Sequence, residues 1–339
     1  MSDASSTKAT RSSSFELLRI ISMLLIVMHH FSVHGGYFDG VSAFNQSIID
    51  AFATGGKLGV NIFILITGYF MVSSKFKMSK LIQLVLQVTF YSTLLYLVLL
   101  GVGVVEFSGG DLANSILSVT TDGYWFMSTY LVLYALTPFI NKLINACSFK
   151  ELVILVVFLY FIQLEIPYVI NNFISNVGWF IMLYIIGGMI RLYPNKLTGS
   201  LGLMLPVSLI TFFMMFLLYP LFGFHLHAMQ SPICVICAVS TFITFKNIKM
   251  KNSRVINFIS STTLGIYLIH DNDFVRPWLW RAVLRCPERA MKDGFLLFAV
   301  ISVLIVFVVC MIIDILRIYL FTGISNLFKK RQIKAKASL

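Results

Sequence analysis

Residues Ser14–His34 read SFELLRIISMLLIVMHHFSVH, a stretch apolar enough to enter a membrane that nevertheless begins with Glu16 and Arg19 and ends in histidines. An α-helix turns by about 100° and rises by about 1.5 Å per residue. Arg19 and His30 are eleven positions apart, so they lie about 20° apart in azimuth and about 16 Å apart along one face. Titratable side chains at such depth usually face a bundle interior or a wet cavity. The stretch therefore predicts a membrane helix with one functional face.

Simpler interpretations apply to the same side chains. Arg19 could be only a membrane-surface anchor that pairs with Glu16, its structural partner three residues earlier. His30 could be an ordinary hydrogen-bonded core histidine. His29 points about 100° away from His30, which predicts a packing or lipid-facing residue. His34 lies one turn beyond His30 on the same face, so we expect it to border any site that His30 serves.

The composition of the 339-residue chain excludes an ordinary soluble domain. The chain is 58% hydrophobic and 12% charged, with a mean hydropathy of +0.88, whereas about 25% of the residues in soluble domains are charged. We therefore predict an all-α polytopic membrane protein. We expect no removable signal peptide, because the first apolar run contains Arg19 and ends in histidines instead of a small-residue cleavage site.

Apolar segments of about 17–25 residues, the length of a membrane-spanning helix, recur along the chain. They predict about ten transmembrane helices, at residues 16–34, 57–73, 79–101, 124–145, 151–168, 173–192, 201–222, 229–246, 255–271 and 295–323. We expect three regions. They are a disordered cytoplasmic N-terminus at residues 1–14, one transmembrane domain at residues 15–323 and a basic cytoplasmic tail at residues 324–339.

The distribution of basic residues indicates the orientation of these helices. If both chain ends are cytoplasmic, most of the 26 lysines and arginines fall on the inner side, as the positive-inside rule requires. Attraction to anionic lipid at that surface explains the net charge of +12, and we expect no nucleic-acid partner. The five cysteines form neither a disulfide framework nor a zinc motif, so we predict no bound metal.

Four stretches occur together in a distinctive order and spacing. They are FELLRI at residues 15–20 with Arg19 eleven positions before His30, GVNIF and TGYF within residues 59–70, YWFM at residues 124–127 followed by Tyr134 and Pro138, and LGIYLIH at residues 264–270. Together they resemble the integral-membrane acyltransferase-3 family, bacterial enzymes that O-acetylate cell-surface glycans. The resemblance runs approximately over residues 12–323.

Two positions depart from the pattern of that family. Thr67 stands where the family usually has a serine. Lys77-x-x-Lys80 replaces the RxxR motif, which keeps the charge but loses the bidentate fork of arginine. The second change weakens the expectation that this motif binds phosphate.

The resemblance implies that an acyl group moves from cytoplasmic acyl-CoA to a hydroxyl of a cell-surface or lipid-linked glycan across the membrane. It also implies that His30 is catalytic, either as the base that takes the hydroxyl proton or as a transiently acylated group. Coenzyme A carries phosphates and needs a cluster of cations at the inner face. The expected donor-binding residues are Arg19, Lys75, Lys77 and Lys80.

We expect the acceptor site near the outer ends of the helices. Aromatic and carboxylate side chains there suit a sugar, although they also fit an interfacial belt or an ordinary helix-end cluster. The loop FVRPWLWRAVLR at residues 274–285 fits an interfacial or re-entrant piece, or the mouth of a site for an acidic or sugar ligand. The candidate acceptor residues are His34, Asp122, Tyr124, Trp125 and His270.

Two other functions stay open at this point. A transporter or flippase for a glycolipid or small solute would use His30 as a proton relay, but the sequence shows no inverted repeat. An intramembrane metal hydrolase would use His30 and His34, which have the spacing of helix-borne ligands, but no third ligand is evident. Dependence on acyl-CoA separates the transferase from both alternatives, and loss of activity with chelators would favour the hydrolase.

The expected partners follow from the transferase interpretation. They are acyl-CoA, a polysaccharide or lipid-linked glycan acceptor and membrane lipid, with no bound cofactor. Either the bundle completes the transfer alone, or a separate protein of the glycan pathway receives the acyl group. The acyl group is expected to be acetyl, with succinyl or another as the alternative. The expected location is the bacterial plasma membrane.

Overall fold

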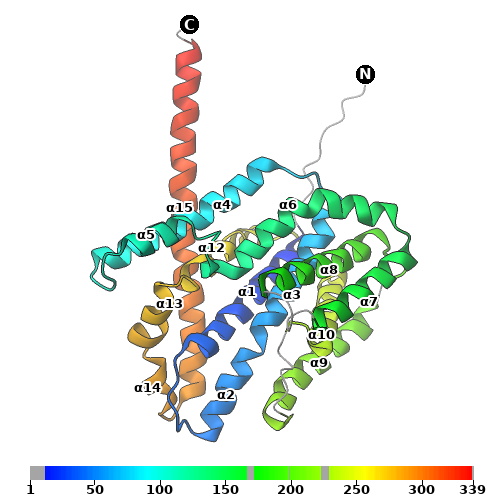
Figure 1. Ribbon diagram of the computed structural model, residues 1–339, viewed down its shortest axis with the longest axis horizontal. Helices are drawn as coiled ribbons and strands as arrows, with labels where there is room; N and C mark the ends of the chain where they lie inside the picture. The colour runs from blue at the N-terminus through cyan, green and yellow to red at the C-terminus, as the bar shows by residue number, and fades with distance from the viewer. Residues whose placement is uncertain (1–11, 166–171, 198, 223–228, 338–339) are drawn as a thin grey trace.

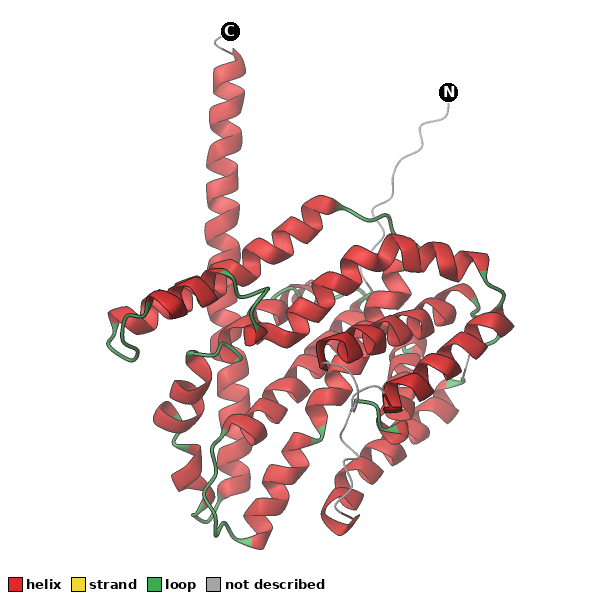
Figure 2. Cartoon of the chain, in the orientation of Figure 1, coloured by secondary structure: helices red, strands yellow, loops and turns green. Residues whose placement is uncertain are grey.

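The computed structural model describes residues 12–165, 172–197, 199–222 and 229–337, and within them it contains helices and loops but no strand (Figure 2). The longer helices are α1 (Ser13–His34), α3 (Gly55–Met71), α4 (Met78–Gly101), α6 (Trp125–Ala146), α7 (Phe149–Glu165), α8 (Asn172–Leu192), α9 (Leu201–Phe222), α10 (Pro232–Asn247) and α15 (Phe295–Ala337). The shorter ones are α2 (Ala43–Ala53), α5 (Gly109–Ile116), η1 (Asp122–Tyr124), α11 (Arg254–Ser260), α12 (Thr263–His270), α13 (Val275–Pro277), a π-helical turn (Trp278–Val283) and α14 (Cys286–Ala290).

The all-helical class and the membrane character expected from the sequence are confirmed. Five spans are long and apolar enough to cross a membrane: Ser13–His34, Ala43–Met71, Met78–Gly101, Ile174–Leu192 and Phe295–Asn326. The second of these joins α2 to α3. The total of ten membrane helices and the cytoplasmic placement of both chain ends stay predictions.

The structure divides one expected helix into two and lengthens the helices at the two chain ends. The segment 255–271 is divided into α11 and α12, because the hydroxyls of Ser261 and Thr262 donate to the carbonyls of Phe258 and Ile259, and such local bonds compete with the helical pattern.

At the two chain ends, the helices run further than expected. The first helix starts at Ser13, inside the segment expected to be disordered, while residues 1–11 lie outside the described part. The last helix continues past residue 323 to Ala337, through a lysine-rich tail of good helix formers, and projects beyond the rest of the bundle (Figure 1).

Helix α3 runs through the middle of the bundle, packed between α1 and α8 (Figure 1). Small residues permit this close packing. A Cβ atom at Gly59 would lie 2.6 Å from the backbone oxygen of Ser22, and one at Gly68 would lie 2.2 Å from the backbone oxygen of Tyr184. In membranes, glycines at helix crossings let backbones approach closely. The crossing at Gly59 fixes the position of α1 relative to α3.

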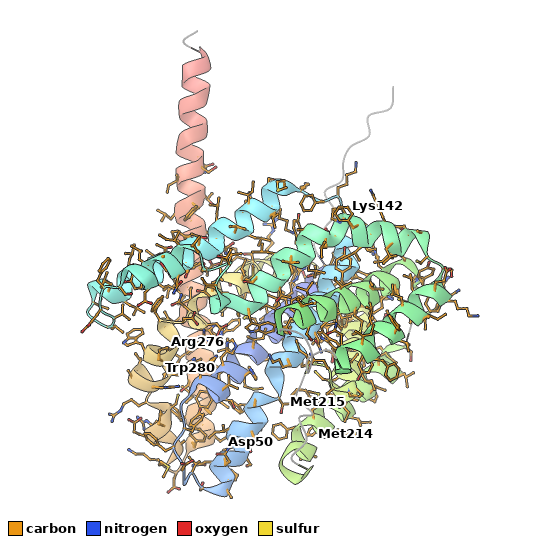
Figure 3. All side chains as sticks on the ribbon, viewed as in Figure 1. Asp50, Lys142, Met214, Met215, Arg276 and Trp280 are labelled. Atoms are coloured by element: carbon orange, nitrogen blue, oxygen red, sulfur yellow. The ribbon has the colours of Figure 1, made fainter. Side chains whose placement is uncertain are left out.

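The two ends of α1 are held by different neighbours. At its start, Ser13 donates a hydrogen bond to the Asn257 side chain and accepts one from the backbone N–H of Ser253, which ties α1 to α11. Near its end, Phe31 packs edge-on against Trp280 of the π-helical turn. Figure 3 labels Trp280 and Arg276 where the short helices lie beside α15. Helix α1 is therefore fixed at both ends, and one of its faces borders the cavity described next.

Candidate functional site

A cavity of about 600 Å³ lies along α1, between this helix and α3, α4, α6 and α12. Side chains of α1 line it from Arg19 at one end to His34 at the other. Its other lining residues include Lys57 and Thr67 of α3, Lys80 of α4, Trp125, Phe126 and Tyr130 of α6, Tyr267 of α12, and Asp271 and Arg276 beyond α12. The face of α1 expected to be functional therefore borders a real cavity.

His30 lies at the wall of this cavity, 7% exposed, and its partner behind the wall is His270. The two rings meet at 2.9 Å, through Nδ1 of His30 and Nε2 of His270. The other nitrogen of His270, Nδ1, lies 2.5 Å from the carbonyl oxygen of Ile266. Because a carbonyl oxygen can only accept, Nδ1 of His270 carries a proton.

This assignment fixes the protonation of His30 as well. The complete burial of His270 favours its neutral form, in which Nε2 is an acceptor once Nδ1 is protonated. Nδ1 of His30 therefore donates to His270. Because His30 is itself buried, its neutral form is favoured as well, and in that form Nε2 keeps its lone pair. A histidine whose one nitrogen is fixed as a donor, and whose other carries a lone pair, has the arrangement of a general base.

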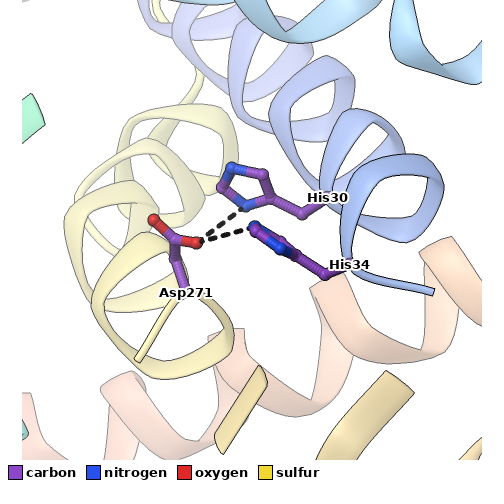
Figure 4. Close-up of side chains that lie close together, drawn as sticks. All are labelled: His30, His34 and Asp271. Carbon is purple, nitrogen blue, oxygen red and sulfur yellow. Dashed lines mark ion pairs between the residues drawn. The ribbon is translucent and has the colours of Figure 1, made fainter. Parts of the chain in front are cut away.

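A buried carboxylate lies beside the same nitrogen. The Oδ1 atom of Asp271 is 3.5 Å from Nδ1 of His30, 3.5 Å from Nε2 of His34 and 3.6 Å from Nε of Arg276. Figure 4 shows His30 and His34 of α1 facing Asp271, with the second ring nitrogen of His30 on the far side of its ring. A fixed negative charge at this distance stabilises an imidazolium that forms when His30 takes a proton.

The cavity end near the start of α1 carries two cations. Arg19 donates to both carboxylate oxygens of Glu16, at 2.9 and 3.1 Å, and Glu16 also accepts a 2.5 Å bond from Ser260 of α11. The Nζ atom of Lys80 lies 5.7 Å from the centroid of the Tyr134 ring. Because Glu16 holds the guanidinium from one side, Arg19 can present its remaining donors to a ligand.

The other expected donor-binding residues do not reach this cavity. Lys75 and Lys77 are exposed on the segment before α4 and are not among the residues that line it. The backbone of Lys77 exchanges two hydrogen bonds with the hydroxyl of Tyr134, at 3.2 and 3.3 Å. This contact holds Lys77 at the start of α4. Lys80, three residues later in that helix, lines the cavity.

Four of the five expected acceptor residues separate into two groups. His34 and Trp125 line the cavity. Tyr124 and His270 are buried behind its wall, where the Tyr124 hydroxyl donates to the carbonyl of Leu268 at 2.7 Å and accepts from Asn272 at 2.9 Å. Asp122 belongs to η1, and its side chain lies outside the described part of the structure.

The position of His29 agrees only in part with the packing or lipid-facing role that helical spacing predicts. Its Nδ1 lies 2.7 Å from the carbonyl oxygen of Ala53, and a Cβ atom at Gly56 would lie 2.3 Å from its ring. His29 is thus packed against the start of α3, and it also borders the cavity, so it does not face lipid alone.

His30, His34 and Asp271 together also have the atoms of a metal site. Ligand atoms of His30, His34 and Asp271 lie within 4.8 Å of one another. The sequence shows no third ligand beside the two histidines, and the tertiary structure brings Asp271 to them. The fit to a metal is incomplete, because Nδ1 of His30 already binds His270 and the Arg276 cation lies 3.6 Å from the same carboxylate oxygen.

Lys57, Asp271 and Arg276 line this cavity, but they are not among the site residues expected from the sequence. Asp271 follows His270 in the sequence and was expected only to belong to the cluster at the end of that helix. Arg276 lies in the loop at residues 274–285, which was expected to be either an interfacial piece or the mouth of a site. Lys57 gave no sequence signal. Its Nζ lies 4.5 Å from the centroid of the Trp125 ring, a contact that joins α3 to α6 and depends on the tertiary fold.

A comparison with protein families found a match that covers most of the chain. A family model described as an acyltransferase domain, that of the acyltransferase-3 family, matches residues 12–315. The chain belongs to the acyltransferase-3 family. The matched region runs from just before α1 to Ile315 in α15 and includes every cavity residue named above. A search of curated proteins and a search of solved structures found no significant match.

Proposed function

We propose that this protein is a membrane O-acyltransferase that moves an acyl group, most simply acetyl, from cytoplasmic acyl-CoA to a glycan hydroxyl. The acceptor would be a cell-surface or lipid-linked glycan of a bacterial plasma membrane. The observation that carries the proposal is the hydrogen bond from His30 to His270, which leaves a basic nitrogen at the wall of the cavity. Family membership supports an acyltransferase in general.

In this proposal the donor enters at the end of the cavity near the start of α1. Arg19 and Lys80 bind the phosphates of coenzyme A as charge-assisted donors, and Lys75 and Lys77 attract the anion at the surface. The pantetheine arm then extends along α1, over the distance of about 16 Å that separates Arg19 from His30 on the helix. This places the thioester beside the imidazole.

The chemical step begins when Nε2 of His30 takes the proton of the acceptor hydroxyl. The hydroxyl oxygen attacks the thioester carbonyl, and the tetrahedral intermediate expels the coenzyme A thiolate. The imidazolium of His30 then gives its proton to that thiolate, so the histidine returns to its starting form. Asp271 stabilises the imidazolium between these two proton transfers.

The direct test is acyl transfer in proteoliposomes. Radiolabelled acetyl-CoA is supplied on the Lys80 side and total cell-wall or capsular glycan on the other side, with His30→Ala as the inactive control. We expect label in the glycan only with the unsubstituted protein. If acetyl-CoA and other acyl-CoA donors all fail to transfer label, the transporter with His30 as a proton relay becomes the better function.

A second candidate is a metal hydrolase, favoured by one observation, the close approach of His30, His34 and Asp271. It is tested by dialysis against a chelator followed by metal analysis. A transferase that uses His30 as a base keeps its activity after dialysis, whereas a hydrolase loses it and regains it when zinc is returned.

A further inference from the structure

Lys57 places a cation on the cavity wall with no carboxylate within ion-pair distance among the described residues, and its acidic neighbour is Asp271, which attracts it from farther away. Among the described residues, the arginines of the cavity pair with acids, Arg19 with Glu16 and Arg276 with Asp271 and Asp273. Lys57 forms no such ion pair there, and its ammonium lies 4.5 Å from the centroid of the Trp125 ring. The ring face attracts a cation, but it does not neutralise the charge.

The charged side chains that line the cavity carry an excess of positive charge, as Lys57 does. Four of its lining side chains are lysine or arginine, and one, Asp271, is a carboxylate. Asp271 is already surrounded by His30, His34 and Arg276. A cation inside a membrane protein is costly unless an opposite charge or a ligand compensates it. The excess charge at Lys57 therefore favours a ligand that is anionic at this point.

The position of Lys57 along the cavity indicates which substrate carries the anion. The neighbouring Gly56 packs against the ring of His29, so Lys57 enters the cavity near the level of His30. The donor phosphates belong with Arg19 and Lys80, about 16 Å away along α1. An anion at Lys57 must therefore belong to the acceptor, close to the hydroxyl that reacts.

We propose that Lys57 forms an anion subsite for the acceptor, so that the acylated glycan carries a carboxylate or a phosphate near its reacting hydroxyl. The inference rests on the proposed acyltransferase function. Trp125 holds the ammonium in place and presents aromatic surface beside it, and the subsite leaves Nε2 of His30 free to receive the hydroxyl proton. Lys57 is a specificity residue in this scheme and takes no part in proton transfer.

The test uses the full-length protein in nanodiscs with three soluble acceptors and labelled acetyl-CoA. Methyl glucuronide carries a carboxylate, glucose 1-phosphate a phosphate, and methyl glucoside neither. We expect at least one anionic acceptor to exceed the neutral one in kcat/KM. Lys57→Gln should raise KM for that acceptor about 10- to 100-fold, the range for loss of a bond to a charged group, and should change KM for the neutral acceptor far less. Lys57→Arg should retain most of the preference.

Lys196→Gln is the matched control, because the ammonium of Lys196 lies 4.8 Å from the centroid of the Phe149 ring, away from the cavity. We expect it to behave as the unsubstituted protein does. A preference for methyl glucoside overturns the proposal. So does a Lys57→Gln variant whose kcat falls equally for all three acceptors, because Lys57 would then stabilise the reaction itself.

Equilibrium binding of the two anionic sugars, measured without acetyl-CoA, separates this inference from the function on which it rests. Lys57-dependent binding without coenzyme A release from any acceptor would support the subsite and reject the transferase. Coenzyme A release together with sugar binding that does not depend on Lys57 would support the transferase and reject the subsite. Comparison of the glucuronide with the sugar phosphate shows which anion the subsite takes.

Discussion

Two buried charged clusters in this bundle look similar in composition and differ in what surrounds them. In one, Asp314 of α15 accepts from the Tyr91 hydroxyl at 2.5 Å and from Arg317 at 2.6 and 3.2 Å. In the other, Asp271 lies 3.5–3.6 Å from His30, His34 and Arg276. The first cluster is closed by protein atoms on α4 and α15, whereas the second opens onto the cavity.

This difference in surroundings distinguishes a structural charged cluster from a candidate functional one in a membrane bundle. Asp314 is fully buried, and its short bonds satisfy both carboxylate oxygens. A Cβ atom at Gly265 would lie 2.1 Å from the Asp314 side chain, so this cluster also fixes α12. The Oδ1 atom of Asp271 has no hydrogen-bond partner of ordinary length among the described residues, and its neighbours include the candidate base.

The largest effect should come from His30→Gln, which keeps a polar side chain but removes the basic nitrogen. We expect acyl transfer to fall by about 10²- to 10⁴-fold, the usual contribution of a general base. Transfer is measured as label in the glycan, and folding as the melting temperature. A variant that keeps more than a tenth of the activity would show that His30 is not the base.

Asp271→Asn should have the next largest effect, because it removes the charge that stabilises the imidazolium while it keeps the shape. We expect kcat to fall about 10- to 100-fold, where each factor of ten corresponds to about 1.4 kcal/mol, with little change in the KM for acyl-CoA. Single-turnover transfer at saturating donor measures this loss. An effect confined to KM would assign Asp271 to substrate binding instead.

Arg19→Gln should act mainly on donor binding. Removal of one charge-assisted bond to a phosphate should raise the KM for acyl-CoA about tenfold or more. Lys75→Gln provides the comparison, because Lys75 is an exposed cation outside the cavity and its loss should change KM by less than about twofold. Equal changes in the two variants would argue against a donor site at Arg19.

Asp314→Asn should have the smallest effect on the rate per folded molecule. The loss of a buried ion-pair partner leaves Arg317 uncompensated, which is expected to destabilise the protein by about 3–5 kcal/mol. The yield of folded protein and its melting temperature should fall, while kcat of the folded fraction stays unchanged. If kcat falls as far as in Asp271→Asn, the closed cluster also takes part in the reaction.

The sequence by itself determined the helical membrane class, the face of α1 that borders the cavity and the family. These depend on apolar length, on helical periodicity and on motif order, which are local properties of the chain. Periodicity also placed Arg19, His30 and His34 on one face, because an α-helix has a fixed rotation per residue. The division of residues 255–271 into α11 and α12 was missed, since apolar content outweighed the local hydroxyl bonds.

Only the tertiary structure decided which side chains meet. His30 and His270 are 240 positions apart, yet their rings are hydrogen-bonded, and this contact assigns the basic nitrogen. The same packing brings Asp271 to two histidines of α1, places Lys57 over Trp125, and leaves Lys75 and Lys77 outside the cavity. Spacing along one helix cannot specify these contacts, because they depend on how α1, α3, α6 and α12 cross.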